Sequence, residues 1–261
     1  MKNIETKEDL KKATDLALTV SMIMVKNGAE IFRAEDASEK VLRAIPEITQ
    51  ADSYCYPTGV FVSCEYKGKD YTMFRKISLE TYNMKPVEDC NSLLREFVDT
   101  DLSIEEALDR AQEILHRKPA SRKQVTISAA FACAFFALLF GGDFRDFSAA
   151  AIAGFTVSNV IYSISKYSLT FFIENFIGAF LSALIAVVLN KIGFGNNVDY
   201  TVIGAIMILV PGFPITNAAR DIFSNQYMSG IIGVTKALFQ AFSIAAGVGI
   251  VLKVVGLWNF F

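Results

Sequence analysis

The side chains in this sequence that are most able to carry out chemistry are the few charged ones in its apolar second half. Residues 124–261 hold only 11 of the 52 Asp, Glu, Lys and Arg residues. Glu174 is predicted about one and a half turns inside one apolar segment, and Lys236 at a similar depth in a later one. A carboxylate in lipid is expensive, and one with a raised pKa can load and release a proton. A functional and a structural role therefore both stay open for Glu174, whereas Lys236 can also snorkel to the interface.

The segment Leu209–Asp221 (LVPGFPITNAARD) carries the sharpest local signal. Its motif Pro211-Gly212-Phe213-Pro214 removes two backbone donors and adds a flexible glycine, so no ordinary helix is predicted to run through it. Many transporters use broken membrane helices to expose backbone amides and carbonyls to a ligand. The alternative is that the membrane span ends here and that residues 217–226 form a polar loop or an interfacial helix.

Three polar side chains come shortly after this motif. In the transport interpretation, Arg220 and the free backbone amides hold a substrate carboxylate, and Asn217 orients it. Either Asp221 or Glu174 then carries the proton. These residues, with Lys236, Pro211, Gly212 and Pro214, form the predicted substrate and proton pathway.

Catalytic and metal-binding patterns are missing from the sequence. It has no GxSxG, P-loop or GxGxxG motif, and its single histidine, His116, argues against a His-rich metal site or a His-based triad within this chain. Its four cysteines show no CxxC spacing, so we expect free thiols. We predict no enzymatic activity, no metal and no cofactor. The run Glu30-x-x-Arg33-x-Glu35-Asp36 is most simply a solvated helix face.

The charge distribution predicts two domains, an α+β cytoplasmic domain at 1–118 and a transmembrane helical domain at 119–261. In the first, apolar residues recur at helical spacing up to Asn27-Gly28, a helix stop, and again from 31 to 45. Three strands are predicted next, at 54–56, 60–66 and 71–77, with Val60, Val62, Cys64 and Tyr66 on one face. Helices are expected at 87–98 and, after a capping box at Ser103, up to about residue 116.

The second domain is predicted to be an all-α polytopic bundle of about five transmembrane helices. Apolar segments occupy 125–140, 147–165, 169–189, 200–210 together with the residues beyond it, and 231–255; the first is short and the fourth is broken. Small residues along them predict close helix packing, and Asn159, Asn175 and Asn190 are expected to join helices.

The basic residues just before the first apolar segment predict a cytoplasmic N-terminal domain. They are Arg117, Lys118, Arg122 and Lys123, and the polar stretch 1–10 shows no apolar targeting run. An odd number of spans then places Phe261 outside, with Trp258 at an interface.

Four separated stretches resemble the threonine/serine exporter family. They are 27–35 (NGAEIFRAE), 57–63 (PTGVFVS) with Phe74-Arg75-Lys76-Ile77, 102–115 (LSIEEALDRAQEIL) and 209–221. By this resemblance Gly28, Glu30, Arg33 and Glu35 match a motif of the cytoplasmic domain, and the motif residues of 211–221 match a second one.

The resemblance implies the first half of a split exporter in the bacterial inner membrane. It implies a second small membrane subunit as partner, export of threonine, serine or dicarboxylates such as succinate, and proton-driven antiport. No nucleic-acid partner is expected, and a homo-oligomer stays open. The alternative function is a membrane-anchored regulatory or scaffold subunit whose cytoplasmic domain binds a metabolite or a protein.

Overall fold

The chain folds into two compact units, seen in a computed structural model that describes residues 2–77, 82–167 and 170–258. Residues 257 and 258 are described by their backbone alone. The first unit combines Met1–Lys118 with Phe213–Val234, and the second combines Pro119–Gly212 with Thr235–Phe261. One border between these units lies after Lys118, and the first unit also takes up a segment of the second half. The expectations for the Trp258 side chain and for Phe261 lie outside the described residues.

The first unit begins with two helices joined by a tight turn. Helix α1 (Lys7–Lys26) starts with a capping box formed by Thr6 and Asp9, and it ends at the C-cap Asn27. Gly28 comes next with a φ of +81°, the left-handed conformation that favours glycine. Helix α2 (Ile31–Arg43) then starts at once. The predicted helix stop at Asn27-Gly28 is confirmed.

A three-stranded antiparallel sheet comes after these helices, in the order β1-β2-β3. Strand β2 (Gly59–Tyr66) buries the four residues predicted to share a face, and β3 covers Lys69–Lys76. Strand β1 (Ile48–Tyr56) begins six residues before the predicted start. Its first residues are mostly polar and carry no strand pattern, but they pair with the far end of β2, where Ile48 lies opposite Tyr66. Pairing with a neighbour, which no local pattern encodes, sets this boundary.

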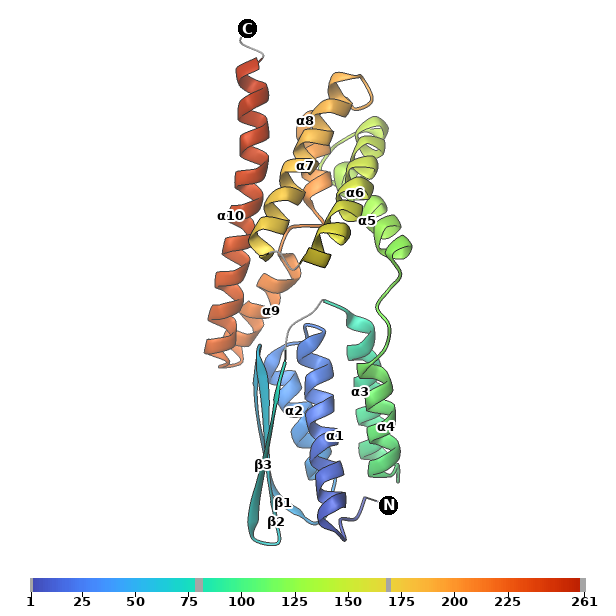
Figure 1. Ribbon diagram of the computed structural model, residues 1–261, viewed down its shortest axis with the longest axis vertical. Helices are drawn as coiled ribbons and strands as arrows, with labels where there is room; N and C mark the ends of the chain where they lie inside the picture. The colour runs from blue at the N-terminus through green and yellow to red at the C-terminus, as the bar shows by residue number, and fades with distance from the viewer. Residues whose placement is uncertain (1, 78–81, 168–169, 259–261) are drawn as a thin grey trace. The chain divides into compact units, whose positions relative to one another are not determined.

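Helices α3 (Met84–Asp99) and α4 (Ile104–Leu115) complete the main body of the first unit. The Ser103 hydroxyl accepts the backbone N–H of Glu106 at 3.2 Å, which is the Ser103 half of the predicted capping box. Figure 1 shows α1 and α2 between the sheet on one side and α3 and α4 on the other. Large side chains from all these layers, such as Leu16, Val62 and Phe97, form one buried core.

The second unit is helical. It contains α5 (Arg122–Leu139), α6 (Phe144–Ile164), the 3-10 turn η1 (Ser165–Tyr167), α7 (Phe171–Lys191), α8 (Val198–Ile206) and most of α10 (Tyr227–Trp258). Four helical stretches of the described chain are long and apolar enough to cross a membrane: Arg122–Leu139, Phe144–Tyr167, Phe171–Lys191 and Tyr227–Gly256. These stretches correspond to the four predicted segments other than the fourth, which was predicted to be broken.

The predicted fourth segment is broken, as expected. It forms two short helices, α8 with 9 residues and α9 (Gly212–Phe223) with 12, and neither reaches the roughly 20 residues that a span needs. The break covers 207–211, one turn earlier than predicted, because Pro211 disfavours the helical conformation of the residue before it. Pro214 instead lies in the first turn of α9, where a missing N–H costs nothing.

Small residues let the helices of the second unit approach closely. A Cβ on Gly204 of α8 would lie 2.7 Å from the Cys133 carbonyl of α5, and one on Gly247 of α10 would lie 2.7 Å from the Phe176 carbonyl of α7. The three predicted joining residues each bridge two helices: Asn159 bonds Arg122, Asn175 bonds Gln240 and Asn190 bonds Thr201. Close backbone contact and side-chain amides thus hold this unit together.

Candidate functional site

The two motifs singled out in the sequence meet within the first unit. The Asn217 side chain of α9 donates to the Gly28 carbonyl at 2.7 Å, just where α1 ends. Asp221, one turn further along α9, accepts the backbone N–H of Ile31 at 3.0 Å, just where α2 begins. Segments about 190 residues apart in the chain are therefore joined at the turn between α1 and α2.

Asp221 supplies the cap that α2 lacks. The N-cap residue of α2, Glu30, makes no capping bond with its own side chain, so the first N–H groups of the helix need another acceptor. A carboxylate at a helix N-terminus also interacts favourably with the helix dipole. The second Asp221 oxygen accepts the Ser229 hydroxyl of α10 at 3.1 Å. Asp221 is only 5% exposed.

An ion pair lies beside this cap. The Glu30 carboxylate accepts from Arg220 at 2.6 Å and from Arg33 at 3.4 Å. Glu30 is 6% exposed, so the prediction of a solvated face is wrong for this residue, although it holds for Arg33 and Asp36. The Arg220 side chain remains 60% exposed. One end of the pair is thus buried and the other is open to solvent.

Glu35 forms a third link between α2 and the C-terminal segment. One of its oxygens accepts the Cys55 backbone N–H of β1 at 2.9 Å, and the other accepts the Gln226 side-chain amide. Sequence reasoning missed both Gln226 and Ser229 as site residues. Both are small or neutral polar groups at the start of an apolar run, and neither has a local signal that distinguishes it from a helix cap.

The pKa values of three carboxylates in this cluster, the buried Asp221 and Glu30 and the half-buried Glu35, are shifted in different directions. Burial raises the pKa of Asp221, and the nearby Glu30 charge adds to this, against the opposing bonds from Ile31 and Ser229. Burial likewise raises the pKa of Glu35. Burial also acts to raise the pKa of Glu30, but its own backbone N–H and Arg220 outweigh burial and hold that pKa below the ordinary value. The cluster thus combines one firmly ionised carboxylate with two that take up a proton more readily.

We name these residues the α9–α2 polar cluster: Gly28, Glu30, Arg33, Glu35, Asn217, Arg220, Asp221, Gln226 and Ser229. An aromatic contact supports it, because the Phe213 ring of α9 meets the Tyr82 ring at 5.4 Å between centroids. Tyr82 in turn lies against Gly28, where an added Cβ would come within 2.3 Å of its ring. Gly28 is therefore required both for its backbone conformation and for space.

The helix break itself belongs to the second unit, and neighbouring helices bond carbonyl groups in it and just before it. The Leu209 carbonyl accepts the Gln240 side chain at 2.8 Å. The Ala205 carbonyl accepts from Cys133 at 3.5 Å and from Ser182 at 3.4 Å. Pro211 is buried beside them. Irregular backbone is tolerated at membrane depth when neighbouring helices satisfy it in this way.

Glu174 and Lys236 also belong to the second unit. Glu174 lies in the first turn of α7 and is half-buried, and its carboxylate has no hydrogen bond or ion pair with any described residue. Lys236 is exposed, with its ammonium 5.6 Å from the centre of the Phe171 ring. The predicted pathway residues therefore do not form one cluster within either unit.

The described residues give no support to metal binding or to chemistry by the Cys55 and Cys90 thiols. Across the described ranges, no group of three His, Cys, Asp or Glu side chains is placed to hold a metal ion. Burial raises the pKa of the Cys55 and Cys90 thiols to about 12, which leaves almost no nucleophilic thiolate at neutral pH.

Four candidate spans, a broken helix and a buried polar cluster define a polytopic helical membrane protein. The chain belongs to the threonine/serine exporter family (ThrE), whose family model matches residues 15–255. This confirms the resemblance found in the sequence. The family is one of exporters and not a class of enzymes, as the missing catalytic motifs predicted.

Two curated relatives match over nearly their whole length. The chain is similar to a protein of Klebsiella aerogenes named "Probable succinate transporter subunit YjjP", with 22% identity over 94% of each chain. It is equally similar to the protein of that name from Escherichia coli K12, with 23% identity over 96% of this chain and 97% of the relative. No solved structure matches the chain significantly.

Proposed function

We propose that the chain is one subunit of a secondary-active, proton-driven exporter of small hydrophilic metabolites in the bacterial inner membrane. Membership of an exporter family supports transport, and two full-length relatives named as transporter subunits support the need for a second membrane subunit. The family name favours threonine and serine, and the names of the relatives favour succinate. All three substrates carry a carboxylate, which is the group the proposal uses. The N-terminal domain lies in the cytoplasm in this proposal.

The observation that carries the proposal is the half-open Arg220–Glu30 pair. Arg220 is exposed enough to meet a ligand, whereas its partner Glu30 is buried. A substrate carboxylate that reaches Arg220 competes with Glu30 for the same guanidinium group. In this proposal Asn217, about one turn earlier on α9, orients that substrate. In this proposal Glu30 occupies the position of the substrate carboxylate in the resting protein.

Proton coupling results from the same exchange. When Arg220 turns to the substrate, Glu30 loses one of the interactions that hold its pKa down, so it binds a proton more readily. Asp221, with a raised pKa, is the second proton carrier. Substrate binding and proton uptake are then thermodynamically linked, so each favours the other. Glu174 remains a candidate proton carrier within the second unit, because no described residue compensates its charge.

The test is efflux from cells lacking their own exporters and preloaded with labelled succinate, or with serine and threonine supplied as a dipeptide. The chain is expressed alone, with a candidate second membrane subunit, or without either. Efflux that requires both proteins supports the proposal and identifies the substrate class. Correct co-assembly in the membrane with no efflux of any of these substrates contradicts it.

A scaffold or sensor function is the second candidate, favoured by a different observation. A groove of about 330 Å³ lies between α2 and α3, and its lining includes the cations Arg33, Lys40 and Arg95 and the acids Asp36 and Asp99. Such a groove suits a small polar or charged ligand. Binding of succinate to the full chain that is lost in Arg95→Gln, without any efflux, would favour this second function.

A further inference from the structure

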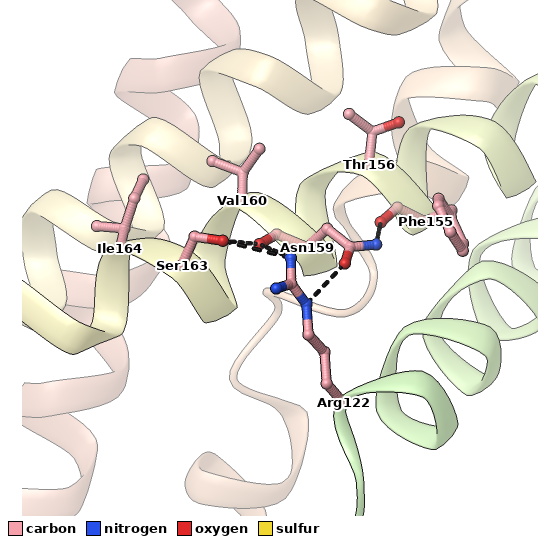
Figure 2. A pocket seen from close by; sticks show the side chains of 7 residues that line it. All are labelled: Arg122, Phe155, Thr156, Asn159, Val160, Ser163 and Ile164. Carbon is pink, nitrogen blue, oxygen red and sulfur yellow. Dashed lines mark hydrogen bonds between the residues drawn. The ribbon is translucent and has the colours of Figure 1, made fainter.

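A second cationic site lies in the other unit, where α5 begins and α6 ends. A pocket of about 440 Å³ is lined there by Arg122, Phe155, Thr156, Asn159, Val160, Ser163 and Ile164 (Figure 2). Both helices are candidate membrane spans, and Arg122 is the first residue of one of them. The pocket thus lies at the end of two spans, at the depth where lipid headgroups meet the hydrocarbon.

Arg122 points into this pocket and is held only by neutral groups. Its Nε donates to the Asn159 side chain at 2.9 Å, and its Nη2 lies 3.4 Å from both the Asn159 carbonyl and the Ser163 hydroxyl. Figure 2 shows the guanidinium between these two α6 residues. Across the part of the chain that the structure describes, no carboxylate forms an ion pair with Arg122. Its position is fixed while its charge remains uncompensated.

An aromatic ring and a second cation extend the site. The Arg122 guanidinium carbon lies 5.0 Å from the centre of the Tyr162 ring, and the Lys166 ammonium lies 5.8 Å from the same centre. Lys166 forms no ion pair with any described acid. Two cations beside one interfacial tyrosine, with no acid between them, form a site for an anion.

The rest of the pocket is apolar except for Thr156, whose hydroxyl donates to the Ile152 carbonyl. Phe155, which is 49% exposed, lies with Val160 and Ile164 on the same side of α6 as the polar residues that hold Arg122. A free anion gains nothing from such a lining, whereas an acyl chain attached to the anion buries apolar surface there. The cationic side chains match the charged headgroup of an anionic phospholipid, and the apolar lining matches its acyl chain.

We propose that this pocket binds an anionic phospholipid, with Arg122 and Lys166 facing its phosphate and with Phe155, Val160 and Ile164 against the first part of an acyl chain. The site is independent of the α9–α2 polar cluster and of the transported substrate. Its function is to anchor the start of α5 and the end of α6 at one leaflet.

The test is lipid binding to the purified full chain, titrated in detergent and followed by native mass spectrometry. Phosphatidylglycerol should bind at least about tenfold more tightly than phosphatidylcholine, because only the former has a net charge. Arg122→Gln should remove about tenfold of that affinity, since a hydrogen bond to a charged group is lost. Lys123→Gln is the matched control: it removes a neighbouring, exposed cation that does not line the pocket, and it should change binding less than twofold.

A second variant covers the case in which Arg122→Gln folds poorly. Ile164→Trp fills the apolar part of the pocket and leaves Arg122 in place, so it should weaken phosphatidylglycerol binding severalfold. Inorganic phosphate tested alone separates the two sources of the anion. Equal affinity for the two lipids, equal losses in Arg122→Gln and Lys123→Gln, or binding of inorganic phosphate as tight as that of the lipid would each overturn the proposal.

Discussion

Removal of the Asp221 carboxylate should break the contact between α9 and the N-terminus of α2 and lower the stability of the first unit. In Asp221→Ala the Ile31 N–H loses its acceptor, and Ile31 is only 4% exposed, so water cannot replace it. Leaving a buried N–H unpaired costs about 1–3 kcal/mol. The Ser229 hydroxyl, also buried, loses a bond worth about 1 kcal/mol. Relief of the buried charge beside Glu30 offsets part of this, so we expect a net loss of about 2 kcal/mol in the stability of the first unit.

Two measurements on the purified full chain test this value. A loss of about 2 kcal/mol should lower the thermal unfolding midpoint by about 4–8 °C. Hydrogen exchange followed by mass spectrometry should show faster exchange in the peptide that contains Ile31, because its N–H is no longer bonded. Asp221→Asn should cost less than about 1 kcal/mol, since its amide oxygen can still accept the Ile31 N–H.

The matched control is Asp199→Ala. Asp199 lies in the first turn of α8 and is exposed, so its removal should change stability by no more than about 0.5 kcal/mol. Equal midpoints for Asp221→Ala and Asp199→Ala, or unchanged exchange at Ile31, would refute the capping role of Asp221.

The α9–α2 polar cluster leads to three further predictions. Glu30→Gln frees Arg220 from its competitor, so efflux assays should give a half-saturating substrate concentration that is severalfold lower, together with a reduced maximal rate; an unchanged concentration would contradict the exchange. The pKa of Glu30 is held below its ordinary value of 4.5, so its stabilising effect is complete above that pH and is lost as the pH falls through the lowered value. Thermal unfolding of Glu30→Gln should therefore show a deficit at neutral pH that closes as the pH falls through the lowered pKa of Glu30, and a constant deficit would be the contrary result. Gly28→Ala should destabilise the first unit by about 2–3 kcal/mol through strain and the clash with Tyr82. Gly68→Ala, with a similar φ of +70° but open space around it, should cost only about 1 kcal/mol.

Local features of the fold were predictable because local physics sets them. The stop at Asn27-Gly28 results from glycine's freedom in the left-handed region, and the buried face of β2 results from strict alternation. The boundary of β1 was not predictable, since only its pairing with β2 makes Ile48 part of a strand. Hydropathy indicated a fourth span at 200–210, but Pro211 limits α8 to nine residues.

The candidate site was predictable in its parts and not in its assembly. Each motif stood out on its own, Asn217 to Asp221 for its polar groups after an apolar segment and Gly28 to Glu35 for its charges. Nothing local indicates that Asp221 caps α2 or that Arg220 pairs with Glu30, because these contacts join residues 190 apart. Glu30 is buried where this contact forms, and no local pattern encodes the contact, which is why a solvated face was the natural prediction.

The most direct test of the central claim is efflux by Asp221→Asn compared with Asp199→Asn. Both variants exchange one carboxylate for an amide, and both are compared at equal abundance in the membrane, with the second subunit co-expressed. The proposed exporter requires that Asp221→Asn loses proton-driven efflux of the substrate while Asp199→Asn keeps it. Normal efflux by Asp221→Asn would contradict the role of this carboxylate in transport.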